Sequence, residues 1–184
     1  MSTATLFTIG HSNRTLDEFF TTLHAQGIRQ LIDVRRLPQS RRYPSYNRNT
    51  LSLACDDEKI AYVWFGLELG GLRNEKSDSP HCALTSSSFR GYADHMQSKL
   101  FLNGIDKLAA LTRAQPVAIM CAEREPSQCH RSMIADYLSL RDWQITHLLA
   151  PRQSSNHTLN PLARNENNTP IYDRLGQEQL DLGF

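Results

Sequence analysis

The chain has 184 residues, of which 40% are hydrophobic and 21% are charged, and its formal net charge is +1. This length fits one domain with a sizeable core, and the near-zero net charge excludes a general attraction to nucleic acid or membrane surfaces. No apolar run approaches the roughly 18 residues that a membrane span needs, and the N-terminus lacks the pattern of a signal peptide. We therefore predict a cytoplasmic protein without membrane partners, whose four cysteines are reduced rather than paired in structural disulfides.

Strands and helices are predicted to alternate through most of the chain. Short aliphatic runs predict buried strands at 5–10, 28–35, 60–67, 116–121 and 143–150. The first helix follows at once, because Thr15 and Glu18 form a capping box and Gly27 suits the end of the helix. Apolar residues at helical spacing predict further helices at 50–59, 89–97, 101–114 and 125–141.

This order of elements predicts an α/β fold. We expect a single three-layer α/β domain over 1–150, with a mostly parallel five-stranded sheet and helices on both faces. Residues 151–184 are rich in asparagine and contain three prolines. We predict that they form an irregular C-terminal extension, packed on the domain or trailing from it.

Polar and reactive side chains follow the predicted strands. In open α/β sheets ligands bind beyond the carboxyl ends of the strands, so we expect these side chains to converge on one edge of the sheet. They are His11 and Ser12 after the first strand, Asp33 and Arg35 at the end of the second, Glu68, Gly70 and Gly71 after the third, Cys121 and Glu123 at the end of the fourth, and His147 on the fifth. Each has an ordinary structural alternative, which for His147 is a hydrogen-bonded core histidine.

The segment CAEREPSQCHR, residues 121–131, is the most informative part of the sequence. It places Cys121 at a strand end and puts Cys129, His130 and Arg131 near the start of a helix. The N-terminus of a helix favours anions, and together with basic neighbours it favours a thiolate over a thiol. The cysteine pair therefore has four open roles: nucleophile, redox disulfide, metal ligands, or small buried hydrophobic residues.

Known cysteine motifs do not settle the choice among these roles. The spacing of the two cysteines matches neither a Cys-x-x-Cys redox pair nor a zinc ribbon. Ser127 stands where a phosphatase or rhodanese loop would carry an arginine. We predict no role for Cys55 and Cys82.

A second candidate region is DVRRLPQSRRYPSYNR, residues 33–48, which contains five arginines and two tyrosines. Arginine forks bind phosphates, and tyrosine rings offer stacking faces, so the loop could clamp a nucleotide or a single-stranded nucleic acid. The alternative is an ordinary solvated loop. Of these arginines, Arg35 and Arg42 are the candidate ligand contacts. In FRGYADHM, residues 89–96, Arg90 is a further candidate, whereas the rest of that helix is predicted to pack.

The segments TIGHSNRTLDEF, LIDVRRLPQSRR, ELGG, FRGYADHM and MCAEREPSQCHRSMIADYL occur in this order over residues 5–150. Together they resemble the family catalogued as domain of unknown function 488, uncharacterised proteins of bacteria and archaea. The resemblance implies a compact α/β fold and a defining signature of two cysteines, a glutamate, a histidine and an arginine. In this chain the signature falls on Cys121, Glu123, Cys129, His130 and Arg131.

The main hypothesis is an enzyme with a cysteine-centred site, a thiol-dependent hydrolase or transferase. Cys121 would attack the substrate, and Glu123 or His11 would move the proton. An anionic small molecule or a nucleic acid would be held by Ser12, Asp33, Arg35, Arg42, Arg90, Cys129, His130 and Arg131. Two alternatives stay open: a non-catalytic nucleotide or nucleic-acid binder, and a zinc or iron protein with Cys121, Cys129 and a histidine such as His130 as ligands. The pattern assigns no cofactor to the main hypothesis and leaves the oligomeric state open.

Overall fold

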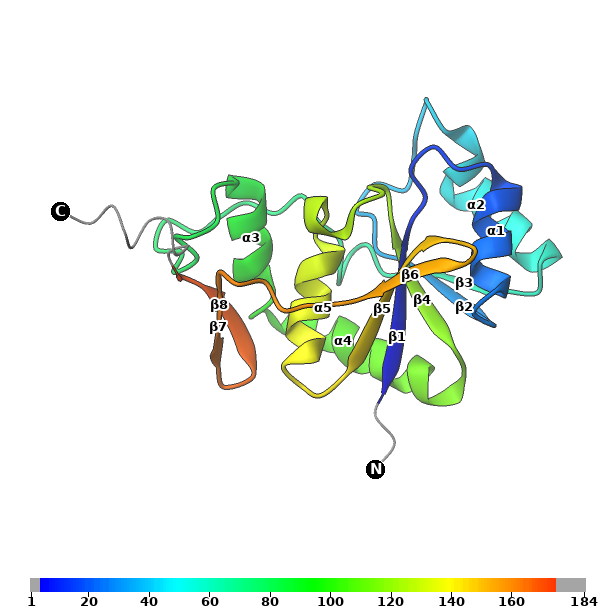
Figure 1. Ribbon diagram of the computed structural model, residues 1–184. Coiled ribbons are helices and arrows are strands. Elements are labelled where there is room, and N and C mark those ends of the chain that lie inside the picture. The colour runs from blue at the N-terminus through cyan, green and yellow to red at the C-terminus, as the bar shows by residue number, and fades with distance from the viewer. Residues whose placement is uncertain (1–3, 175–184) are drawn as a thin grey trace.

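A six-stranded sheet forms the centre of the computed structural model, which describes residues 4–174 (Figure 1). Its strands are β1 (Thr5–Gly10), β2 (Gln30–Asp33), β3 (Ala61–Trp64), β4 (Val117–Cys121), β5 (Gln144–Ala150) and β6 (Gln153–Asn156). They lie in the order β3-β2-β4-β1-β5-β6, and β1 to β5 are parallel while β6 pairs antiparallel with β5. The predicted α/β fold with a mostly parallel sheet is confirmed, with one strand more than expected.

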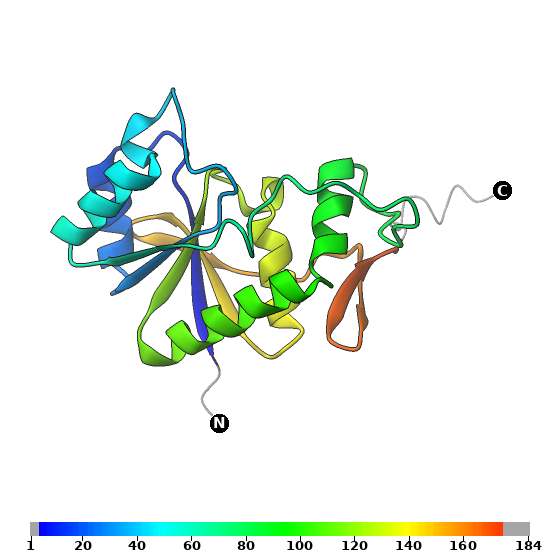
Figure 2. The same cartoon turned by 180° about the vertical axis from the view of Figure 1, so that it is seen from behind.

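Helices cover both faces of this sheet, as Figures 1 and 2 show. The helices α1 (Leu16–His24) and α2 (Arg48–Asp57) bury Phe19, Leu23 and Leu51 against one face. The other face is packed against α4 (Lys99–Ala114) and α5 (Arg131–Ser139), and α3 (Ser87–His95) lies beyond α5 in the same apolar cluster. The burial of apolar side chains in two separate clusters confirms the three-layer arrangement. Within residues 4–174, none of the helices is both long and apolar enough to cross a membrane.

The start of α1 follows the sequence pattern. The hydroxyl of Thr15 accepts a hydrogen bond from the backbone N–H of Glu18 at 3.2 Å, which satisfies one of the free donors of the first turn. After the helix, Gly27 has a φ of 63°, a left-handed conformation that glycine adopts without strain. The predicted capping residue and the predicted end of this helix are both confirmed.

The helix predicted over 125–141 is instead divided in two. A short 3₁₀ helix spans Pro126–Gln128, and α5 begins only at Arg131. Cys129 between them has extended backbone, with φ −138° and ψ 143°. The expectation that Cys129 lies within the first turns of a helix is therefore wrong. The break lets the chain turn back, so that the second cysteine faces the end of β4.

The C-terminal segment also differs from the prediction. The strand β6 extends the sheet, and β7 (Ala163–Glu166) pairs with β8 (Thr169–Tyr172) in a hairpin, so the expected irregular structure is wrong for these residues. The hairpin turn contains Asn167 and Asn168, with φ of 50° and 63°, and asparagine tolerates this left-handed conformation better than most residues. The part of the predicted extension from 175 to 184 lies outside the described residues.

A hydrogen-bonded network joins this segment to the rest of the fold. Asp136 on α5 accepts hydrogen bonds from the Tyr172 hydroxyl at 2.7 Å and from the Asn160 N–H at 2.9 Å, and it contacts His157 at 2.9 Å. His157 in turn lies 3.0 Å from His147, whose other ring nitrogen is 2.7 Å from the Thr8 hydroxyl. The structural alternative for His147 therefore holds, since the ring is buried and both nitrogens have partners.

The connections of the strands create a crevice at the carboxyl edge of the sheet. β1 leads to α1 on one face, whereas its neighbour β4 leads to α5 on the opposite face. At such a switch point the two connections diverge and leave room for a ligand beyond the strand ends. Gly10 and Cys121 are paired in register at the last position of these two strands. Cys121 therefore occupies the position in the fold where a ligand is expected.

Candidate functional site

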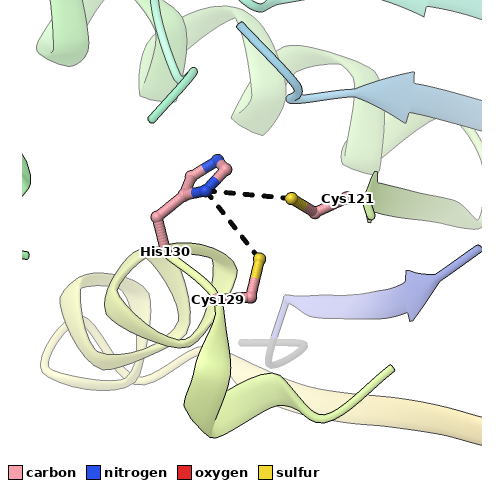
Figure 3. Close-up of side chains that lie close together, drawn as sticks. All are labelled: Cys121, Cys129 and His130. Atoms are coloured by element: carbon pink, nitrogen blue, oxygen red, sulfur yellow. Dashed lines mark hydrogen bonds between the residues drawn. The ribbon is translucent and has the colours of Figure 1, made fainter. Parts of the chain in front are cut away.

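Cys121, Cys129 and His130 form a compact group at this switch point (Figure 3). The sulfur of Cys121 and the sulfur of Cys129 each lie 3.8 Å from Nδ1 of His130. All three atoms lie within 4.8 Å of one another. The close-up shows the two thiols approaching the same ring nitrogen from different elements, one from the end of β4 and the other from the segment before α5. The broken helix start produces this arrangement.

The protonation of His130 follows from its other nitrogen. Nε2 lies 3.0 Å from the backbone oxygen of Val34, and because a carbonyl oxygen only accepts, Nε2 must carry the proton. In the neutral ring, Nδ1 then presents its lone pair to the two sulfurs. Tyr92 packs against the ring with centroids 4.9 Å apart, and a Cβ added to Gly71 would lie 3.0 Å from Nδ1. The ring is thus held in place on several sides.

The pKa values of the two cysteines are shifted in opposite directions. The pKa of Cys121 is well below the usual thiol value, first because the Cys129 thiol donates to it and then because His130 carries positive charge when protonated. Burial raises the pKa of Cys129 well above the usual value, and the neighbouring Cys121 raises it further. Of the two thiols, Cys121 is therefore the more acidic.

Backbone contacts fix the loop after Cys121. The N–H of His11 donates to the carbonyl of Cys121 at 2.9 Å, and the guanidinium of Arg131 donates to the carbonyls of Glu123 at 2.6 Å and Arg124 at 2.5 Å. Arg131 is only 1% exposed. Its side chain holds the loop in shape rather than facing a ligand, which differs from the role predicted for it.

The thiols open onto a cavity of about 400 Å³, which we call the thiol cavity. Cys121 is 7% exposed and Cys129 is 3% exposed, and both line it. Its walls combine apolar side chains with two arginines: Leu37, Leu72, Phe89 and Tyr92, with Arg35 and Arg36. A cavity of this size and mixed lining is typical of a small-molecule site.

Asp33 and His11, both predicted to lie at strand ends, hold the side chain of Arg35 beside the thiol cavity. Asp33 holds it with two contacts, from Nε at 2.9 Å and from Nη2 at 2.6 Å. Nη1 lies 3.2 Å from Nε2 of His11, whose Nδ1 donates to the Ser12 carbonyl at 2.9 Å. Burial, and then the charge of Arg35, lower the pKa of His11 to about 4. Because both ring nitrogens are occupied, His11 positions Arg35 more readily than it moves a proton.

A second cavity of about 420 Å³, the side cavity, adjoins the first. The two share Arg35, Leu37, Ala122 and Glu123 as lining residues. Ser12 and Arg42 line the side cavity, together with His11 and Tyr43. The guanidinium of Arg42 lies over the Tyr43 ring at 5.3 Å. Four predicted site residues, His11, Ser12, Arg35 and Arg42, thus lie in or beside one continuous space with Cys121 and Glu123.

Two predicted ligand contacts lie elsewhere. Arg90 pairs with Glu75 and donates to the Leu84 carbonyl at 2.6 Å, and it lines neither of these cavities. Asp33 is fully buried, so it supports Arg35 instead of meeting a ligand. Conversely, Phe89 and Tyr92 were predicted only to pack, yet they line the thiol cavity. Phe89 and Tyr92 are three residues apart and so lie on one helix face, and this spacing could have indicated that they share a cavity wall.

A group of two cysteines and a histidine at the switch point of a parallel sheet defines the class of protein: an α/β protein with a cysteine-centred cavity. The profile described as "Domain of unknown function DUF488" matches residues 15–138, which is more than half of the chain. The chain belongs to this family. No curated protein and no solved structure matches it significantly.

Proposed function

We propose that this protein is a thiol-dependent enzyme that acts on an anionic substrate in the thiol cavity. The observation that supports it best is geometric: the sulfur of Cys121 lines this cavity and lies 3.8 Å from Nδ1 of His130. A thiolate is the nucleophilic form of cysteine, and enzymes that use one stabilise it with a neighbouring histidine or thiol.

The side chains around Cys121 suit separate steps of such a reaction. The Cys121 sulfur would attack an electrophilic atom of the substrate and form a covalent bond as the leaving group departs. If Nδ1 of His130 also takes up a proton, the positive ring would balance the charge of the thiolate before the attack, while Nε2 stays on the Val34 carbonyl. Glu123 is exposed and lines both cavities, where its carboxylate would accept a proton from the water or acceptor group that breaks the bond to Cys121, while the leaving group takes its proton from solvent. Arg35 and Arg42 would hold the anionic part of the substrate.

Alkylation by iodoacetamide tests the nucleophile directly. An ordinary thiol with a pKa of about 8.5 is only about 0.3% ionised at pH 6. We expect Cys121 to react much faster than this at pH 6, as measured by mass spectrometry of the modified peptides. In Cys121→Ser the fast reaction should disappear, while exposed Cys82 provides the slow reference in both proteins. If Cys121 reacts no faster than Cys82, Cys121 is not an activated nucleophile and the proposal is wrong.

A second candidate function is metal binding by the same three residues. Zinc bonds of about 2.3 Å to sulfur and 2.1 Å to nitrogen, at tetrahedral angles, give a sulfur–nitrogen separation of about 3.6 Å. The two separations here are 3.8 Å. The lone pair of His130 Nδ1 points at the sulfurs, and the proton on Nε2 is held by a carbonyl, as is common for metal-ligating histidines. Two thiolates and one imidazole would suit zinc or iron and leave a fourth position facing the cavity.

Elemental analysis of the freshly purified protein separates the two candidates. If Cys121 is a free nucleophile, we expect less than about a tenth of a metal ion per chain and no effect of a chelator on alkylation at pH 6. One zinc or iron per chain, lost together in Cys121→Ser and Cys129→Ser but retained in Cys82→Ser, would favour the metal site. In that case a chelator should also increase the rate at which Cys121 and Cys129 are alkylated.

A further inference from the structure

A long stretch of the chain beside the thiol cavity is purely basic. Residues 34–55 contain five arginines and no aspartate or glutamate, although the net charge of the whole chain is only +1. Arg35 is neutralised by Asp33. Within the described residues, the other four have no acidic partner within 4 Å; they are Arg36, Arg41, Arg42 and Arg48. Their positive charge is therefore available to a ligand.

Three of these arginines line one hollow of about 960 Å³, which we call the arginine hollow. Arg36, Arg41 and Arg48 contribute the charge, and none of the described residues that line the hollow is acidic. Its polar lining otherwise consists of neutral groups such as Gln39 and Asn47. A hollow with several arginines and no carboxylate suits a ligand with several negative charges.

Aromatic rings accompany the arginines. The guanidinium of Arg48 lies over the Trp64 ring at 4.5 Å, and Arg42 lies over the Tyr43 ring at 5.3 Å. Stacking of this kind fixes the plane of a guanidinium while leaving its N–H groups free at the edge for phosphate oxygens. Arginines mixed with aromatic rings are typical of surfaces that bind single-stranded nucleic acid.

The arginine hollow is continuous with the cavities described above. It shares Arg36 and Leu37 with the thiol cavity, and it shares Leu37, Gln39 and Ser40 with the side cavity. Leu37 is 69% exposed at the point where all three meet, and Leu72, 70% exposed, lines the thiol cavity nearby. Exposed leucines at a junction of polar cavities offer an apolar contact to a flat group such as a base.

We propose that the substrate is a single-stranded nucleic acid, whose phosphates lie along the arginine hollow while one nucleotide enters the thiol cavity. This inference rests on the proposed function and names its substrate class. Four arginines in one segment, with no acidic partner among residues 4–174, favour a polymer of phosphodiesters over a mononucleotide, which would use only part of the surface. The exposed carboxylate of Glu123 lies at the cavities and not in the arginine hollow, so it does not oppose the phosphates there.

Fluorescence anisotropy with a labelled single-stranded oligonucleotide of about 12 nucleotides tests the inference. We expect binding to weaken as salt rises from about 50 to 200 mM, since each phosphate contact adds about 0.7 to the slope against salt. The double variant Arg41→Gln/Arg48→Gln should bind about tenfold more weakly, and its slope should fall by about 1.4. The matched control is Arg29→Gln/Arg113→Gln, which removes the same charge from exposed arginines outside all three cavities.

The outcomes separate this inference from the proposed function. Equal weakening in both double variants, equal binding of heparin, or binding of a mononucleotide alone would overturn the nucleic-acid assignment. Alkylation of Cys121 at pH 6 is measured in the same variants as a separate readout, because neither Arg41 nor Arg48 lines the thiol cavity. Fast alkylation without oligonucleotide binding would leave the enzyme proposal standing and remove only its substrate class.

Discussion

Replacing Cys129 with alanine is expected to slow the alkylation of Cys121 at pH 6 by about tenfold or more. The hydrogen bond from the Cys129 thiol is the largest cause of the low pKa of Cys121. Its loss raises that pKa, and each unit of pKa reduces the thiolate fraction tenfold at a pH below the pKa. At a pH above about 9 the Cys121 thiol is ionised in both proteins, so the rates should converge there. The complete pH profile of the alkylation rate is the measurement.

Cys82→Ala is the matched control, because that cysteine is exposed and lies outside the thiol cavity. Its pH profile should superimpose on that of the unmodified chain. A second comparison is His130→Gln, which keeps a polar side chain but cannot carry positive charge. It should also slow the reaction at pH 6, and if neither replacement moves the profile, the thiol cavity does not activate Cys121 in the way we infer.

Gly10→Ala is expected to destabilise the fold by about 3 kcal/mol and to abolish the fast alkylation of Cys121. A Cβ at this position would lie 1.7 Å from the carbonyl oxygen of Glu123 and 2.6 Å from Nη1 of Arg131. Neither the backbone oxygen nor the buried guanidinium can move without breaking the hydrogen bond between them. Urea unfolding, with alkylation as a second readout, measures both effects.

Gly27→Ala is the matched control for this replacement. Nothing lies within 4 Å of a Cβ added to Gly27, so only its positive φ of 63° makes alanine unfavourable. That conformation costs about 1 kcal/mol for alanine, and alkylation should be unchanged because Gly27 is at the amino edge of the sheet. If the two variants lose the same free energy of unfolding, the close approach of Gly10 to the loop is not the reason that alanine is unfavourable at position 10.

Much of the architecture could be predicted because its signals are local. The aliphatic runs and the capping box at Thr15 defined the strands and α1, and the alternation of elements then required a parallel sheet. The convergence of Cys121, His11 and Arg35 followed from the same rule about strand ends. These residues lie together because the topology places them, and the topology follows from the order of elements.

The internal arrangement of the site could not be predicted in the same way. The break before α5 depends on the guanidinium of Arg131 reaching two carbonyls eight and seven residues earlier in the chain, which no helical pattern reveals. That break is what brings Cys129 to Cys121. Likewise, the position of His130 beside the substrate site stays a prediction, and the contact of its Nε2 with the carbonyl of Val34, 96 positions away, could not be foreseen. Asn167 and Asn168 indicate a hairpin turn, but the prediction for this segment used only its asparagine-rich composition and so expected irregular structure.

The network around Asp136 joins the segment after residue 150 to α5. This carboxylate is buried on the helix that begins with Arg131, and its partners come from Tyr172, Asn160 and His157. A chain shortened to residue 150 would keep all four cysteines. The buried carboxylate of Asp136 would then lack all three of those partners. The family match ends at residue 138, whereas the partners of Asp136 lie beyond it, at His157, Asn160 and Tyr172.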